Sequence, residues 1–218
     1  MQQETRNLKI KSFKFQVSSF KLRQGFGLIE FMIVITVFGI ATAVITASFL
    51  TFERNQRLKS AASMLKNDIR LAQNKALAGD KGPAAECAVT STLVGWYLKI
   101  DTGSGNKSYT IAGDCKDASG TENTFNSKIV YLPRKVIIFG VSCGVFIDGA
   151  YGTIFYQPLI YNASFHNNLA PIFFDSSSGN LTNILCTGND LVITLQAEQG
   201  TNTYQVIVSP SGEVNEQK

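Results

Sequence analysis

The chain has 218 residues, 44% of them hydrophobic, and a formal net charge of +4. Its charge is unevenly distributed. Residues 1–25 carry six Lys or Arg against one Glu, so the rest of the chain carries −1, and residues 82–218 alone carry −4. A C-terminal part with that charge lacks the basic surface by which proteins bind nucleic acid. Nucleic acid is therefore not an expected partner.

The N-terminus combines a basic leader with a long apolar run. Residues 1–25 are polar and show no apolar periodicity, so we interpret them as a targeting segment that lies outside the fold. In the run that follows, residues 26–52, Glu30 is the one charged residue. About 20 apolar residues are enough for a helix to cross a bilayer. The run therefore predicts a membrane-spanning helix, and a carboxylate inside such a span is costly enough to be read as functional.

The same helix is predicted to continue through residues 53–80, because no proline interrupts the chain there. Apolar residues recur at steps of three and four, which predicts an amphipathic helix with one buried face. They are Leu58, Ala61, Ala62, Leu65, Ile69, Ala72 and Ala76. This face could form a coiled-coil seam with a partner, but we expect it to dock on the chain's own sheet, which needs a cover. Gly79, followed by Gly82-Pro83, predicts the end of the helix.

Residues 81–218 show the short alternating runs and turns of an antiparallel β head. Residues 191–197 and 204–208 alternate most clearly, on either side of a turn. Further strands are predicted at 93–100, 107–111, 128–132, 136–139, 153–156 and 172–174. The Asn-rich stretch 161–170 is predicted as a surface loop that carries a solvated His166. The fold class is thus α+β, with one long N-terminal helix packed on an antiparallel β-sheet or sandwich.

Four cysteines follow the apolar run, namely Cys87, Cys115, Cys143 and Cys186. With a membrane span before them, an oxidising compartment and two disulfides are plausible, and three connectivities are possible. The most local loops favour Cys87–Cys115 and Cys143–Cys186. The alternative is four buried free thiols in a reducing compartment.

No residue pattern in the chain indicates catalysis. His166 is the single histidine, so neither a catalytic triad nor a histidine-based metal site is supported. We therefore predict a protein that is not an enzyme, without a catalytic residue, a metal or another cofactor.

Three interpretations of the N-terminal run differ in what they explain. A secretory signal peptide has an apolar core of about 7–15 residues, roughly half the length of this run. A plain single-pass anchor explains the length but neither Glu30 nor the junction of Gly25 and Phe26. The third interpretation accounts for both features.

The segment Gly25-Phe26-Gly27-Leu28-Ile29-Glu30, between a basic leader and about twenty apolar residues, resembles the prepilin signal of type IV pilins and type II secretion pseudopilins. The resemblance implies that a prepilin peptidase cuts between Gly25 and Phe26 and that Phe26 becomes N-methylated. It places Glu30 at the position of the family's assembly glutamate. The expected partners are the peptidase, an inner-membrane assembly platform, membrane lipid before assembly, and other pilins or pseudopilins in a helical filament.

Short patches of the C-terminal half are similar to the H-type minor pseudopilins (the GspH/FimT family). They are Leu132-Pro133 before 136–139, residues 172–175 with Ser178-Gly179, and residues 204–212. The resemblance implies a minor subunit of a pilin-like fold. We expect it in the inner membrane with a cytoplasmic N-terminus and an extracytoplasmic head, and later in an extracytoplasmic filament.

Two other functions remain open at this point. One is a DNA-binding minor pilin of an uptake pilus, although the segment after Gly212 is not basic as it is in that branch of the family. The other is a receptor or adhesin that stays anchored in the membrane and joins no filament.

Overall fold

The computed structural model describes residues 27–83, 87, 90–101, 106–144, 151–167, 173–174 and 180–218. The chain divides into two units, Met1–Thr46 and Ala47–Lys218, which are described separately. The leader, with Gly25 and Phe26, lies outside the described residues. The predicted domain boundaries at 25, 52 and 80 therefore stay predictions.

One long helix, α1 (Leu28–Leu77), runs from the first unit into the second, as its proline-free sequence predicts. It ends in a Schellman motif at Gly79, where the backbone turns left-handed with φ 64°. Asp80 N–H donates to the Lys75 carbonyl at 3.0 Å, and Gly79 N–H donates to the Ala76 carbonyl at 3.1 Å. The Lys75 ammonium also contacts the Asp80 carboxylate at 2.7 Å, and this hydrogen bond lowers the pKa of Asp80.

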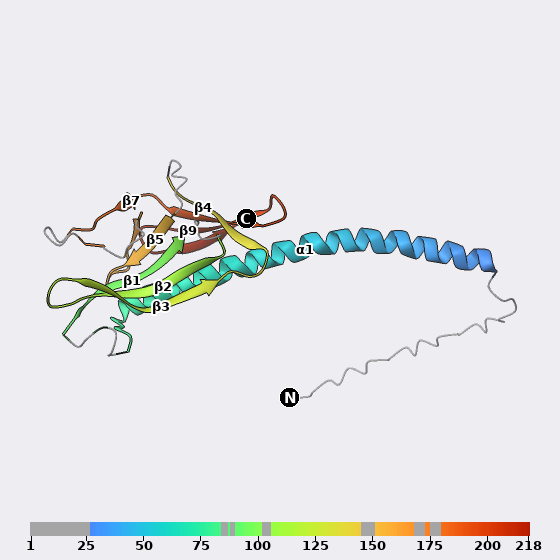
Figure 1. Cartoon of the computed structure of the whole chain (residues 1–218). Coiled ribbons are helices and arrows are strands. Elements are labelled where there is room, and N and C mark those ends of the chain that lie inside the picture. Colours follow the sequence, from blue (N-terminus) through green and yellow to red (C-terminus); the bar gives the residue numbers. More distant parts are fainter. Residues whose placement is uncertain are drawn as a thin grey trace, which may run out of the picture. The chain divides into compact units, whose positions relative to one another are not determined.

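Two antiparallel sheets form the head (Figure 1). The six-stranded sheet has the order β3-β2-β1-β5-β6-β7, and the four-stranded sheet has the order β10-β9-β8-β4. The first contains β1 (Thr92–Asp101), β2 (Ser108–Lys116), β3 (Glu122–Tyr131), β5 (Tyr151–Tyr156), β6 (Ala163–His166) and β7 (Ile184–Cys186). The second contains β4 (Val136–Cys143), β8 (Leu191–Ala197), β9 (Thr203–Val208) and β10 (Val214–Gln217).

One core joins α1 to both sheets. The seven residues predicted to form the buried helix face are at most 2% exposed, which confirms the docking prediction. They pack with alternate side chains of the strands, among them Trp96, Ile138 and Ile193. A helix packed on antiparallel sheets confirms the predicted α+β class.

Polar contacts within this interface fix how the helix is seated on the sheets. Buried Gln73 donates from Nε2 to the carbonyls of Tyr161, at 3.3 Å, and Gly212, at 3.2 Å. Gly212 has φ 83°, and a Cβ there would lie 2.2 Å from the Tyr161 carbonyl oxygen, so only glycine fits. On the neighbouring sheet, Tyr109 donates its hydroxyl to Asp68 at 2.6 Å.

The structure corrects two predictions in the head. The stretch 161–170 is not simply a loop, because Ala163–His166 forms β6 between β5 and β7. His166 is 0% exposed rather than solvated, because Phe155, Phe173 and Thr182 contact its ring. Strands β7 and β10 were not predicted from sequence. Of the predicted strand 172–174, the described residues Phe173 and Phe174 contribute one isolated bridge, between Phe174 and Leu181.

Among the residues that the structure describes, no helix is both long and apolar enough to pass through a membrane. The predicted membrane span at residues 26–52 is thus not confirmed by the structure.

Candidate functional site

Glu30 lies in the first turn of α1, where its carboxylate caps the N-terminus of the helix. Gly27 stands just before the helix, and its N–H donates to Glu30 Oε2 at 3.3 Å. In return the Gly27 carbonyl accepts the N–H groups of Glu30, at 2.9 Å, and Phe31, at 3.3 Å. This is the acidic half of a capping box. A negative charge at this position also interacts favourably with the positive end of the helix dipole.

The described apolar side chains from Phe31 to Phe52 are exposed, over all faces of the helix. Exposed fractions include 62% for Phe31, 54% for Ile35 and 71% for Phe38. Monomeric proteins rarely leave so much contiguous apolar surface uncovered unless it is a binding surface.

The threonines of this segment satisfy their hydroxyl groups within the helix. Thr36 donates to the Ile33 carbonyl, and Thr42 donates to the Phe38 carbonyl, at 2.8 and 2.7 Å. Thr46 donates to the Thr42 carbonyl at 2.8 Å. These hydroxyls need no external partner, so the segment can enter an apolar environment without leaving them unsatisfied.

Residues 20–46 match the family model of the prokaryotic N-terminal methylation motif. The N-terminal segment is of the prepilin type. The match contains Gly25, Phe26 and Glu30, and it supports a type IV pilin or pseudopilin, which is a structural subunit. It covers the N-terminal segment only and does not reach the head. No curated protein and no solved structure matches the chain.

The four cysteines form one disulfide in the structure. Cys143 of β4 is bonded to Cys186 of β7 with 6.1 Å between their Cα atoms, so the bond links the two sheets. Cys87 and Cys115 are free and buried. Burial raises the pKa of the Cys115 thiol to about 12, and a hydrogen bond with the Cys87 thiol acts in the same direction. The two thiols are thus neighbours, and their oxidation to a second disulfide stays a prediction.

A second small core on the six-stranded sheet contains polar residues that sequence reasoning missed. Phe173 stacks on Phe155 with 4.1 Å between ring centroids, and its N–H donates to Glu122 Oε2 at 3.0 Å. Beside Glu122, burial first and the charge of that carboxylate second raise the pKa of Asp114 to about 8.

His166 belongs to the same core and has a structural role. Its Nδ1 lies 2.7 Å from the Thr182 carbonyl, which can only accept, so Nδ1 carries the proton and Nε2 accepts from the Ser164 hydroxyl at 2.8 Å. Its ring edge meets Phe155 and Phe173. Burial lowers the pKa of His166, so the ring is neutral at pH 7.

Proposed function

We propose that the chain is a minor pilin or pseudopilin, a structural subunit of a type IV pilus or a type II secretion pseudopilus. The observation that carries this proposal is the prepilin-type motif, followed by a helix whose apolar side chains are exposed. The patches similar to H-type minor pseudopilins, together with a head of two antiparallel sheets, favour a minor subunit over the bulk one.

The proposed pathway begins in the inner membrane. The basic leader stays in the cytoplasm and the head lies outside, anchored by residues 26–52. Prepilin peptidase cuts between Gly25 and Phe26 and methylates the new N-terminus at Phe26. An assembly platform then moves the subunit from lipid into a helical filament, where neighbouring subunits cover the apolar half of α1. In the filament those neighbours replace lipid in keeping the apolar side chains away from water.

Glu30 has two roles in this proposal. In the single subunit its carboxylate accepts the Gly27 N–H and stabilises the helix start. In the filament it pairs with the terminal ammonium of an adjacent subunit. A carboxylate in an apolar core is tolerated only when it pairs with a cation. This pair would therefore fix the position of each subunit relative to its neighbour.

The processing claim is tested by co-expressing the full chain with a prepilin peptidase and weighing the product. We expect loss of residues 1–25 and one methyl group on Phe26. Gly25→Ala should block cleavage, whereas Gly27→Ala is the matched control, because an added Cβ at Gly27 meets only Ile29 at 3.8 Å. An unprocessed wild-type chain, or a cut elsewhere, contradicts the proposal.

The assembly claim is tested with two substitutions at Glu30. Gln at this position can still cap the helix but carries no charge, whereas Ala removes both functions. We expect both variants to be cleaved and both to be lost from sheared filaments. If Glu30→Gln assembles like wild type, capping alone is its role. If the mature wild-type chain is found in the membrane and never in filaments, the anchored receptor is the better interpretation.

The DNA-binding alternative is tested by gel shift of the full chain in detergent at low salt. Phosphate contacts would make any shift strongly dependent on salt. The −4 charge of residues 82–218 leads us to expect no shift.

A further inference from the structure

A small basic hollow lies in the second unit, where α1 meets the β4 and β8–β9 end of the head. It has a volume of about 60 Å³ and opens to solvent. Its lining includes Arg54, Arg57 and Lys135 against one carboxylate, Glu53, a local charge of +2. Residues 82–218 as a whole carry −4, so this concentration of positive charge is local.

The three cations of the hollow differ in whether they already have an ion-pair partner. Arg57 forms an ion pair with Glu53 and donates to the Arg134 carbonyl at 3.5 Å, so its guanidinium is already held. Arg54 and Lys135 are both exposed, and within the described part of the chain neither has an ion-pair partner. Two cations at the hollow are therefore available to an anion.

The backbone fixes where Lys135 stands. Its φ of 68° lies in the left-handed region of the backbone, which residues other than Gly, Asn and Asp rarely adopt. The strained turn is held on both sides, since Glu198 N–H donates to the Lys135 carbonyl at 2.9 Å and Val136 N–H donates to the Pro133 carbonyl at 3.2 Å. A cation is thus kept at a position where glycine would relieve the strain, and such strain is common at ligand-binding sites.

We propose that this hollow binds a phosphate group, and that an anionic phospholipid headgroup supplies it while the subunit is anchored in the membrane. Guanidinium and ammonium groups are the common protein partners of phosphate. The lining also has an apolar part, Leu50 and Val136, and Leu50 belongs to the apolar run of residues 26–52. This inference rests on the proposed function, because lipid reaches the hollow only in a membrane-anchored subunit.

A larger hollow of about 260 Å³ lies beside Lys59 and Lys218 and is the weaker candidate. Its lining contains two ammonium groups, those of Lys59 and Lys218, and neither residue has the left-handed backbone found at Lys135. Its volume alone indicates no ligand.

The test titrates the full chain in detergent with phosphatidylglycerol, phosphatidylcholine and inorganic phosphate, and counts bound molecules by native mass spectrometry. We expect retention of the anionic lipid. Arg54→Gln with Lys135→Gln should weaken it about 30-fold, because each Lys or Arg near an anionic membrane surface contributes about fivefold. Both side chains are exposed, so an unchanged melting temperature should accompany the loss.

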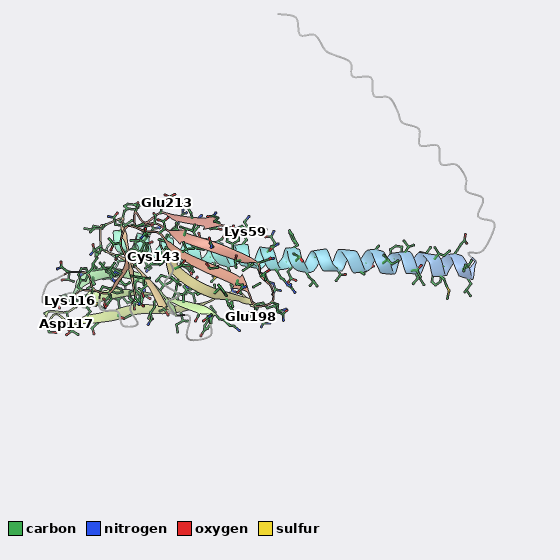
Figure 2. All side chains as sticks on the ribbon, turned by 90° about the horizontal axis from the view of Figure 1, so that it is seen from above. Lys59, Lys116, Asp117, Cys143, Glu198 and Glu213 are labelled. Carbon is green, nitrogen blue, oxygen red and sulfur yellow. A yellow bond between two sulfur atoms is a disulfide. The ribbon has the colours of Figure 1, made fainter. Side chains whose placement is uncertain are left out.

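The matched control is Lys116→Gln with Lys128→Gln, which removes the same charge elsewhere. Lys116 lies at the opposite end of the head from Glu198, the residue whose N–H holds Lys135 (Figure 2). This control should bind lipid like wild type. If inorganic phosphate binds and the lipid does not, the hollow is a phosphate site whose ligand is free phosphate and not a lipid headgroup. Equal lipid binding by both double variants would overturn the inference.

Processing and filament incorporation of the same variants separate this inference from the proposed function. Normal cleavage after Gly25 and normal assembly, with lipid binding independent of Arg54 and Lys135, would reject only the phosphate site. An uncleaved wild-type chain would reject the proposed function, whatever the lipid result.

Discussion

The two halves of α1 differ in what covers their apolar side chains. In the first half, residues such as Ile33 and Phe38 are 56% and 71% exposed. In the second half, Leu65 and Ile69 are fully buried against the sheets. Both halves are equally helical in the chain, so helicity does not distinguish them. One half therefore stabilises the head, whereas the described residues of the chain leave the apolar surface of the other half uncovered.

The largest expected effect sets the two halves directly against each other. Leu65→Ala removes a fully buried side chain and should lower the free energy of unfolding by about 2–5 kcal/mol. Ile33→Ala, in the exposed half, should leave it unchanged. Thermal and denaturant unfolding of both variants in the same detergent measure the difference. A loss of similar size at Ile33 would mean that the first half is buried within the chain after all.

Removal of the inter-sheet disulfide should come next. Replacing Cys143 and Cys186 together by Ala releases a bond across a separation of 43 residues, which typically costs about 2–4 kcal/mol. Stability should fall while cleavage after Gly25 is retained, because the bond lies in the head. A variant that unfolds at the wild-type denaturant concentration would show that the bond contributes nothing.

Oxidation of Cys87 and Cys115 should add a smaller increment, because their loop is shorter. The two thiols would lose two electrons and two protons to a disulfide-bearing oxidant by thiol–disulfide exchange. We expect chain isolated from an oxidising compartment to show two bridges by mass spectrometry without reduction. Two alkylated thiols after unfolding, in chain from that compartment, would contradict the second bridge.

A pH dependence of stability is also expected, and it comes from Asp114. Burial and Glu122 raise its pKa from 3.8 to about 8, so the folded chain holds a proton that the unfolded chain releases between those values. Stability from this group is therefore present below pH 4 and lost as pH rises towards 8. Asp114→Asn should remove that loss, because the amide of Asn binds no proton in this pH range. The free energy of unfolding of the wild-type chain and of the variant is measured at pH 5 and at pH 8. An equal change between the two pH values in both chains would contradict the prediction.

Local patterns predicted the parts of the fold that depend on local periodicity. Steps of three and four from Leu58 to Ala76 predicted the buried helix face, and alternation predicted β8 and β9. The prepilin-type motif could be recognised for a similar reason, because it is one short linear segment of the sequence. Glycine at position 79 likewise marked the helix end through its own backbone freedom.

Features set by distant neighbours could not be predicted in this way. Ala163–His166 has the composition of a loop, and it becomes a strand only because β5 and β7 supply its hydrogen bonds. His166 is buried because Phe155 of β5, Phe173 and Thr182 pack around its ring. Cys143 is bonded to Cys186 because the two sheets bring β4 and β7 together. From the sequence, the length of the loop favoured this pairing but could not establish it.

The long helix, its two contrasting halves, the prepilin-type signal and the α+β class could be predicted from sequence, since each depends on residues close together in the chain. The sheet order, the burial of His166, the pairing of Asp114 with Glu122 and the basic hollow at Lys135 depend on the tertiary structure. Those features bring together side chains far apart in sequence, and only packing of the two sheets and the helix sets their distances.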